Sequence, residues 1–280
     1  MKVTVIGSGI MGSGIAQVCA MEKLSVSIFD INEEQIEKAL VTMKTSLGRF
    51  EKKGRLSESI ETIMDRINIS VSLKEAVQGS SLVIEAAVED LKVKQNIFRE
   101  LDGLTSDDVV LGTNTSQVSI TSIASVVKNP GRVIGIHFFN PAPMMNLIEI
   151  IRGLETTDET LQKVQEFSKM VNKETVVCKK DRNGFLTSRL ILAFRAEAIR
   201  MLEEGVGTVE DIDKACRLGF NHPMGPFELN DFNGLDLGYK AFKSMEEVYG
   251  ERFKVPQLLE NMVNANRLGR KTGKGWYDYE

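Results

Sequence analysis

Hydrophobic residues in the first two thirds of the chain fall alternately into short continuous runs and longer segments with apolar positions three or four apart. Short runs predict strands, and helical spacing predicts amphipathic helices. The predicted strands are residues 3–6, 26–29, 82–84, 109–111, 133–138, 147–151 and 175–178. The predicted helices are residues 11–22, 33–53, 58–64, 93–101 and 159–172. This alternation predicts an α/β fold with a mostly parallel, Rossmann-type sheet covered by helices.

The pattern changes after Asp181, where strand-like runs give way to long helical segments. Here the predicted helices are residues 185–204, 209–218, 226–248 and 257–265. Thr208 is a typical helix start, and Gly205 and Gly219 are typical helix ends. The sequence therefore predicts an α/β domain over residues 1–182 and an all-α C-terminal domain over residues 183–280.

Composition narrows the possible classes of function. The 280 residues carry a formal net charge of −4, and 42% of them are hydrophobic, which is ordinary for a globular protein. An acidic balance argues against a nucleic-acid-binding protein. No apolar run reaches the ~18 residues that indicate a membrane span. A predicted strand begins at residue 3, so we expect no targeting peptide, no membrane partner and a cytoplasmic location.

Few side chains are available for metal or redox chemistry. The cysteines are Cys19, Cys178 and Cys216, and neither their spacing nor that of His137 and His222 is typical of a metal site. We therefore expect reduced, buried cysteines and no bound metal. His222 precedes a proline in a predicted loop and is interpreted as structural.

A glycine-rich loop joins the first predicted strand to the first predicted helix, with the spacing GxGxxG over residues 7–12. In this context the glycines allow a tight turn, close approach of a pyrophosphate and close packing of helix on strand. Free N–H groups at the helix start then face the phosphates. The residues assigned to this contact are Gly7, Gly9, Ile10, Met11 and Gly12.

An acidic residue, Asp30, ends the second predicted strand, eighteen residues after Gly12. A carboxylate at this point accepts hydrogen bonds from the adenine ribose hydroxyls and repels a 2′-phosphate. The sequence therefore predicts NAD rather than NADP as the cofactor. FAD uses the same fingerprint and is the main alternative.

Two polar residues interrupt otherwise apolar predicted strands. His137 lies near the end of the strand at 133–138, and Glu149 lies within the strand at 147–151. The proline-rich turn between them could place the strands side by side and bring the carboxylate to the imidazole. Such a carboxylate fixes the tautomer and makes the other ring nitrogen a better base. The pattern alone leaves a structural hydrogen bond and a catalytic pair equally open.

A polar segment, Thr113-Asn114-Thr115-Ser116, follows the predicted strand at 109–111. Its hydroxyl and amide groups could line a cofactor and substrate pocket at the end of the sheet. Alternatively, they cap a helix over residues 119–125, which the pattern alone favours.

Taken together, these motifs make the chain resemble the L-3-hydroxyacyl-CoA dehydrogenase family, and within it the bacterial 3-hydroxybutyryl-CoA dehydrogenases. The resemblance covers the whole chain. It rests on the glycine loop at 7–12, IEAAVE at 84–89, NTS at 114–116, HFFNP at 137–141, NHPMGP at 221–226 and GRKTGKG at 269–275.

The resemblance implies roles for particular residues. His137 would be the catalytic acid and base, Glu149 would orient it, and Ser116 would bind the 3-oxygen of an acyl-CoA substrate. The positions implied to contact NAD are Glu89, Lys94, Ser116, Asn140 and Lys274. The helical domain would help to close the substrate cleft and would form a homodimer.

One position departs from the family pattern. Where members often have Gly-Phe-x-x-Asn-Arg, this chain has Ser188 in place of the asparagine. A serine hydroxyl can still donate to a substrate oxygen, but it is shorter and has no second donor. Ser188 is therefore predicted to contact the substrate.

Two cations of the second predicted helix, Arg49 and Lys53, are four residues apart and share one helical face. The resemblance makes them candidates for the phosphates of CoA. A solvated basic helix end is the alternative. Two other functions also stay open: a dehydrogenase acting on a free β-hydroxyacid, and a dinucleotide-binding protein without catalysis.

Overall fold

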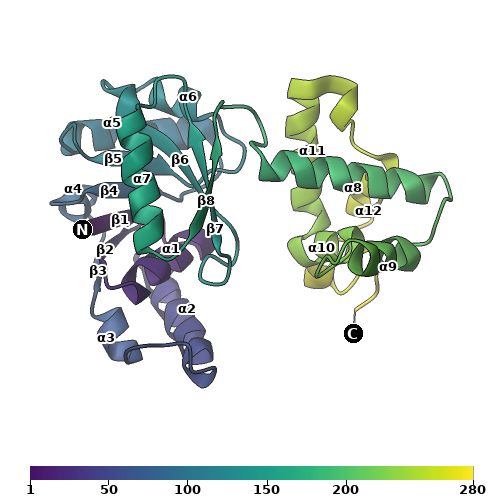
Figure 1. The fold of residues 1–280 in the computed structure, drawn as a ribbon, viewed down its shortest axis with the longest axis horizontal. Helices are drawn as coiled ribbons and strands as arrows, with labels where there is room; N and C mark the ends of the chain where they lie inside the picture. Colours follow the sequence, from purple (N-terminus) through teal and green to yellow (C-terminus); the bar gives the residue numbers. More distant parts are fainter. Residues whose placement is uncertain (280) are drawn as a thin grey trace. The chain divides into compact units, whose positions relative to one another are not determined.

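The computed structural model describes residues 1–279. The chain divides into two compact units, Met1–Arg182 and Asn183–Glu280. The first unit contains all eight strands, and the second consists of helices and loops (Figure 1).

One sheet forms the centre of the first unit, with the strand order β3-β2-β1-β4-β5-β6-β7-β8. Neighbouring strands are parallel except β6 and β7, which are antiparallel. The strands are β1 (Lys2–Ile6), β2 (Ser25–Phe29), β3 (Ile67–Ser70), β4 (Leu82–Glu85), β5 (Val110–Thr113), β6 (Val133–Phe138), β7 (Leu147–Arg152) and β8 (Glu174–Cys178). The order reverses between β1 and β4, which is where open α/β sheets bind ligands. The predicted fold class is confirmed.

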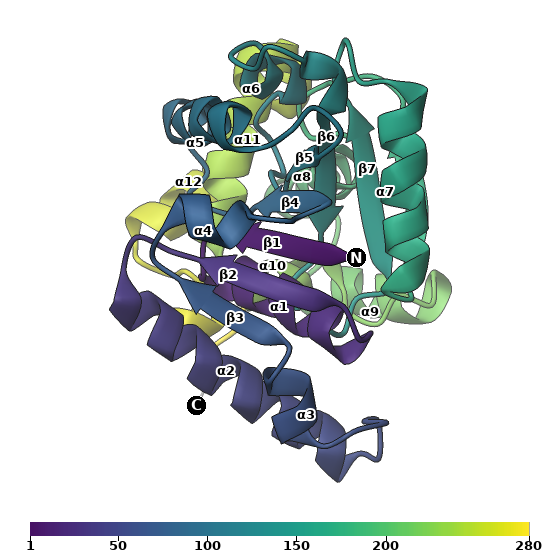
Figure 2. The same cartoon turned by 90° about the vertical axis from the view of Figure 1, so that its left-hand side faces the viewer.

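Helices cover both faces of the sheet (Figure 2). They are α1 (Ile10–Met21), α2 (Glu33–Lys52), α3 (Ile60–Met64), α4 (Leu73–Val77), α5 (Leu91–Leu104), α6 (Ile120–Ala124), α7 (Asp158–Met170) and a 3₁₀ turn, η1 (Pro130–Arg132). The helices α1, α2, α3 and α7 share one buried apolar cluster with the sheet, while α4, α5 and α6 lie on the other face. Central strands buried by both layers are mostly apolar, so the polar residues Glu85 in β4 and His137 in β6 stand out from hydrophobic neighbours in the sequence.

Two elements, β3 and α4, were not predicted. In β3 the residues Ile67-Asn68-Ile69-Ser70 form a four-residue strand at the edge of the sheet, and Ile69 is exposed. A short, half-polar run has little periodicity of its own, and its strand conformation comes from parallel pairing with β2. The helix α4 has only five residues and begins at the capping hydroxyl of Ser72.

The second unit contains five α-helices within the described residues: α8 (Thr187–Glu203), α9 (Val209–Gly219), α10 (Pro226–Asn233), α11 (Leu235–Tyr249) and α12 (Gln257–Asn264). The single helix predicted over 226–248 is wrong, because it is two helices interrupted at Gly234. Gly234 has φ +98°, a backbone conformation that residues with a side chain rarely adopt. Two 3₁₀ turns, η2 (Gly250–Phe253) and η3 (Arg270–Thr272), complete the unit.

The C-terminal segment is attached to this unit by two buried carboxylates. Asp231 accepts hydrogen bonds from the backbone N–H groups of Trp276 and Tyr277 at 2.9 and 3.0 Å and from the Tyr279 hydroxyl at 2.8 Å. Asp213 accepts from the Tyr277 hydroxyl at 2.9 Å and from two backbone N–H groups at the start of α10. Both carboxylates therefore have their hydrogen-bond partners inside the unit.

Within the described residues, no helix is both long and apolar enough to span a bilayer. The cysteines are all free and buried, and burial raises the pKa of the Cys19 thiol to about 12.

We expect Gly234→Ala to lower the free energy of unfolding of the second unit by about 1–3 kcal/mol, because a side chain at this φ is strained. The added Cβ would also lie 2.9 Å from Asp236 Oδ1. The matched control is Gly103→Ala in α5, where the new Cβ meets nothing within 4 Å, and which should raise stability by about 0.5–1 kcal/mol. Urea unfolding of both variants measures the difference, and equal effects would contradict the explanation of the helix break.

Candidate active site

The glycine loop connects β1 to α1 and leaves the start of the helix open. Gly9 is the N-cap and has no side chain to occupy the first N–H groups, and the first turn has no acidic residue. A Cβ on Gly12 would lie 1.8 Å from the Gly7 carbonyl oxygen, whereas a Cβ on Gly9 would meet nothing within 4 Å. The loop is thus closely packed at Gly12 and open at Gly9. The N–H groups at the start of the helix suit an anion such as a pyrophosphate.

Asp30 follows β2 beside this loop. Its Oδ2 accepts hydrogen bonds from the backbone N–H and the hydroxyl of Ser8, both at 2.8 Å, and its Oδ1 accepts from the Asn32 N–H at 3.1 Å. The carboxylate therefore holds the glycine loop in shape, a role that the sequence did not indicate. Its position at the end of β2 is the one predicted for contact with a ribose.

His137 and Glu149 are opposite each other on the antiparallel strands β6 and β7. His137 Nδ1 lies 2.9 Å from Glu149 Oε2, and the two residues are 8% and 0% exposed. An ionised carboxylate only accepts hydrogen bonds, so Nδ1–H is the donor and Nε2 is left as the second ring nitrogen. The Phe139 ring lies 4.5 Å from the imidazole, centroid to centroid. This arrangement holds the imidazole in one orientation and one tautomer.

The polar segment after β5 lies beside β6. The Asn114 side-chain oxygen accepts from the Phe138 N–H at 2.8 Å, which connects this segment to the strand that carries His137. Capping of α6 by residues 113–116 is wrong, because Ser119 is the N-cap and accepts from the Ser122 N–H. The segment therefore does not cap α6, and it is attached to the carboxyl end of β6 through Asn114.

Glu89 holds the segment from the other side. Its Oε1 accepts from the Thr115 hydroxyl at 2.6 Å and from the Ser116 N–H at 2.9 Å, and its Oε2 lies 3.3 Å from the Lys94 ammonium. Burial would raise the pKa of the Glu89 carboxyl, but the charge of Lys94 and these hydrogen bonds outweigh it and hold the pKa below its ordinary value. Glu89 is therefore a carboxylate at neutral pH and positions Ser116.

Lys94 lies deeper than a simple cofactor contact would require. It is 1% exposed, and its ammonium donates to both oxygens of Glu85 at 2.9 and 3.0 Å. Glu85 also accepts from the Ala87 N–H at 2.7 Å and from the Thr113 hydroxyl at 2.6 Å. Glu85 was not among the predicted site residues, although a carboxylate ending an apolar strand is a signal that could have identified it.

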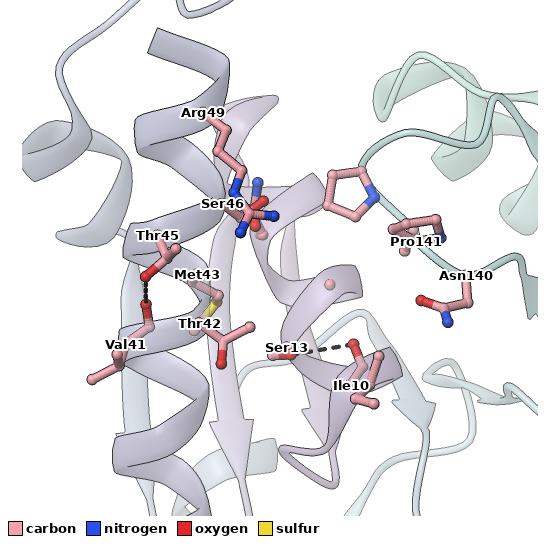
Figure 3. A pocket seen from close by; sticks show the side chains of 14 residues that line it. Ile10, Ser13, Val41, Thr42, Met43, Thr45, Ser46, Arg49, Asn140 and Pro141 are labelled. Carbon is pink, nitrogen blue, oxygen red and sulfur yellow. Dashed lines mark hydrogen bonds between the residues drawn. The ribbon is translucent and has the colours of Figure 1, made fainter. Parts of the chain in front are cut away.

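A pocket of about 320 Å³ lies between α1, α2 and the turn after β6. Figure 3 shows Arg49 on α2 and Asn140 on the turn at opposite sides of it, with Ile10 of the glycine loop below. The structure therefore brings together one residue from each of three predicted contacts: the glycine loop, Asn140 and the basic end of α2. Lys53 is exposed at the C-cap of α2 and does not line this pocket.

The turn at 140–146 is held by Lys173, which the sequence did not single out. Its ammonium donates to the Ala142 carbonyl at 3.1 Å and to the Met145 carbonyl at 2.7 Å. The Asn140–Pro141 peptide bond is cis. Lys173 thus fixes the connection that carries the chain from His137 to Glu149.

The remaining predicted residues belong to the second unit. Ser188 is in the first turn of α8 and is partly buried. Lys274 is exposed, in a segment where it forms isolated β-bridges with Gly269 and Asp278. His222, interpreted from the sequence as structural, is exposed and packs edge-on against the rings of Phe194 and Phe220.

Comparison with known proteins decides the family. Residues 2–182 match the family model for the 3-hydroxyacyl-CoA dehydrogenase NAD binding domain, and residues 184–279 match the model for the C-terminal domain of the same family. The chain belongs to the 3-hydroxyacyl-CoA dehydrogenase family. The resemblance inferred from the motifs is confirmed.

Relatives in this family match along their full length. The 3-hydroxybutyryl-CoA dehydrogenase of Clostridioides difficile is 41% identical, over 100% of this chain and 99% of the relative. A probable 3-hydroxybutyryl-CoA dehydrogenase of Bacillus subtilis is also 41% identical, over 100% and 97%. The crystal structure of the (S)-3-hydroxybutyryl-CoA dehydrogenase of Ralstonia eutropha aligns with a TM-score of 0.95 at 38% identity, covering 100% of this chain and 99% of the other.

Family membership narrows the alternatives left open by the sequence. The glycine loop, Asp30, Ser116, His137 and Glu149 all lie within the part that matches the NAD binding domain, so the cofactor is NAD. A free-acid dehydrogenase and a non-catalytic binding protein are not favoured, because the full-length relatives above carry the name 3-hydroxybutyryl-CoA dehydrogenase.

The buried ion pair between Glu85 and Lys94 leads to a prediction about stability. Glu85→Gln should lower the free energy of unfolding by about 3 kcal/mol, since it leaves the Lys94 ammonium buried with a weaker partner. Adding Lys94→Met should recover part of this loss, giving a coupling of about 1–3 kcal/mol in a double-mutant cycle. Chemical denaturation of wild type, the two single variants and the double variant measures this coupling energy. Strictly additive effects would show that the two side chains do not depend on each other.

Proposed function

We propose that this chain is an NAD-dependent dehydrogenase that interconverts (S)-3-hydroxyacyl-CoA and 3-ketoacyl-CoA, with 3-hydroxybutyryl-CoA and acetoacetyl-CoA as the short-chain pair in fatty acid and butyrate metabolism. The observation that supports it most strongly is the buried contact of 2.9 Å between His137 Nδ1 and Glu149 Oε2. That contact directs Nδ1–H to the carboxylate, so proton transfer is assigned to Nε2, and Phe138, the residue after His137, is bonded to the polar segment that carries Ser116.

In the oxidation direction, His137 Nε2 takes the proton of the 3-hydroxyl group. The glycine loop and Asp30 would hold NAD, which when bound would supply the acceptor for the hydride from C3, so that the C–O bond would become a carbonyl. Glu149 stabilises the imidazolium that results and keeps its ring in place. In the reduction direction the same nitrogen returns its proton to the 3-oxygen.

Ser116 is proposed to donate a hydrogen bond to the 3-oxygen and so polarise the carbonyl. Its backbone N–H is already held by Glu89, which limits how far the hydroxyl can move. Ser188 on α8 is proposed as a second hydroxyl donor to the substrate. Direct contacts of Glu89, Lys94, Asn140 and Lys274 with NAD are proposals from the family pattern.

The CoA moiety is proposed to lie along α2, with its phosphates near Arg49. This guanidinium lines the pocket between α2 and the turn after β6, and a planar fork of N–H donors suits phosphate oxygens. Lys53, one turn further and outside the pocket lining, is proposed as a weaker contact made through solvent.

The second unit is proposed to close the substrate cleft and to pair two chains as a homodimer. It exposes several large apolar side chains, among them Leu190, Leu218 and Phe220 at 72, 76 and 64%. Exposed apolar residues of this size are common where protein surfaces associate. We place the enzyme in the cytoplasm.

The experiment that tests the proposed function measures NADH oxidation with acetoacetyl-CoA and with acetoacetate at equal concentrations. The proposal predicts rapid turnover of the thioester and little of the acid. Preference for acetoacetate would indicate a free-acid dehydrogenase, and NADH binding without turnover of any acyl-CoA would indicate a binding protein.

His137→Gln should lower kcat by about 10²–10⁴-fold, the usual contribution of a positioned acid or base. NADH binding, followed by fluorescence titration, should stay within a few-fold of wild type, because the glycine loop is untouched. Glu149→Gln should lower kcat more than it changes KM for acetoacetyl-CoA. Wild-type turnover by His137→Gln, or an effect of Glu149→Gln on KM alone, would refute the assigned roles.

Asp30→Asn tests the choice of cofactor. The amide keeps an oxygen that can accept from Ser8 but removes the charge that repels a 2′-phosphate. The ratio of kcat/KM for NADH over NADPH should therefore fall by about 10-fold, as expected for loss of one charge–charge repulsion. An unchanged ratio would show that selectivity arises elsewhere.

A further inference from the structure

One wall of the pocket beside α2 is a loop. Residues 140–143, in the turn between β6 and β7, line this pocket opposite Arg49 (Figure 3). The hydrogen bonds within the turn are local, because the N–H groups of Met144 and Met145 both donate to the Pro141 carbonyl, at 2.9 and 3.1 Å. Local bonds of this kind fix the shape of a turn but not its distance from a helix. Contacts with other elements must therefore set the width of the pocket.

Lys173, which directly precedes β8, supplies such contacts from outside the pocket lining. Its ammonium donates to the carbonyl groups of Ala142 and Met145, at 3.1 and 2.7 Å. The next residue, Glu174, donates its backbone N–H to the Asn146 carbonyl at 2.8 Å. Two consecutive residues thus hold the turn at three of its carbonyl groups.

The ammonium occupies this position at a cost in hydration. Lys173 is 9% exposed, and burial lowers its pKa below the ordinary value for lysine, an effect that the charge of Glu22 offsets only in part. The groups that it contacts in the turn are neutral carbonyls. A charged donor binds such acceptors more strongly than a neutral donor does. An apolar side chain here would fill the same space and leave both carbonyls without their donor, so the charge at this position serves the turn.

Gly14 of α1 limits the position of the same turn through a second contact. A Cβ added to Gly14 would lie 3.2 Å from the Ala142 Cβ and 3.5 Å from the Pro143 Cδ. The turn therefore rests against the backbone of α1, and a methyl group at Gly14 would displace it by a few tenths of an ångström. Ala142 is thus fixed twice, at its carbonyl by Lys173 and at its Cβ by Gly14.

We infer that Lys173 is a positioning residue for the nucleotide end of the CoA thioester. It acts through Ala142 and the neighbouring residues of the turn, which face Arg49 across the pocket proposed above for CoA. A ligand group in that pocket contacts both walls at once, so its affinity depends on the distance between them. This inference rests on the proposed function and concerns the end of the substrate that does not react. The reacting end depends on His137 and Glu149, which the β6–β7 pairing holds as well.

The test compares acetoacetyl-CoA with acetoacetyl-pantetheine, which lacks the phosphorylated nucleotide, as substrates for reduction at saturating NADH. In Lys173→Met the ratio of kcat/KM for the CoA thioester to that for the pantetheine thioester should fall by about 10-fold, equivalent to about 1.4 kcal/mol. The change should lie mainly in KM for acetoacetyl-CoA. Lys169→Met is the matched control, because Lys169 is exposed in the last turn of α7, and it should leave the ratio unchanged.

A role in stability alone would lower kcat/KM for both thioesters by the same factor, and an unchanged ratio in Lys173→Met would overturn the inference. Failure of the proposed function looks different, because wild type would then reduce neither thioester. Calorimetric titration with CoA gives a readout that needs no turnover. Its Kd should be about 10-fold higher for Lys173→Met than for wild type, and equal Kd values would also overturn the inference.

Gly14→Ala moves the same wall without removing a buried charge, and it decides the question if Lys173→Met does not fold. Alanine is favoured over glycine inside a helix, so the Tm should stay within a few degrees of wild type. The added methyl group should nevertheless lower the ratio of CoA to pantetheine kcat/KM by about 3- to 10-fold, through displacement of Ala142. A wild-type ratio in Gly14→Ala would show that the position of the turn does not control nucleotide binding and would overturn the inference.

Discussion

The geometry of the candidate site depends on the single reversal of strand direction in an otherwise parallel-paired sheet. Because β7 runs antiparallel to β6, His137 and Glu149 are direct cross-strand neighbours, with side chains on the same face and close enough to bond. A one-residue change of register would turn the carboxylate to the opposite face. The turn at 140–146, held by Lys173, and the parallel pairing of β7 with β8 both fix that register. The sheet therefore holds His137 and Glu149, the pair proposed to transfer the proton, in a fixed relative position.

A second layer of buried charge supports the polar segment beside this pair. Glu85 binds Lys94, Lys94 faces Glu89, and Glu89 holds the backbone of Ser116. Lys94 has a carboxylate on each side, so the buried Glu85–Lys94 pair avoids the full cost of isolated ions, while Glu89 lies at the exposed end of the network. We interpret this network as one that positions Ser116.

Much of this account could be predicted from the sequence, because strong periodicity and isolated polar residues in apolar strands are local signals. The β6 strand, His137 and Glu149 were all visible in that way. Features that depend on distant segments or on backbone conformation could not be predicted. The strand β3 forms only by pairing with β2. The break at Gly234 depends on a backbone conformation that a helical pattern does not reveal. Glu85 and Lys173 act through contacts with residues distant in the sequence.

The central claim is that the imidazole at position 137, held by Glu149, transfers the proton. Chemical rescue tests it most directly: His137→Ala is assayed for acetoacetyl-CoA reduction with increasing imidazole, alone and combined with Glu149→Gln. The account predicts very slow turnover without imidazole, a rate that rises with imidazole while Glu149 is present, and weaker rescue in the double variant. Turnover by His137→Ala close to the wild-type rate without imidazole, or equal rescue with and without the carboxylate, would contradict it.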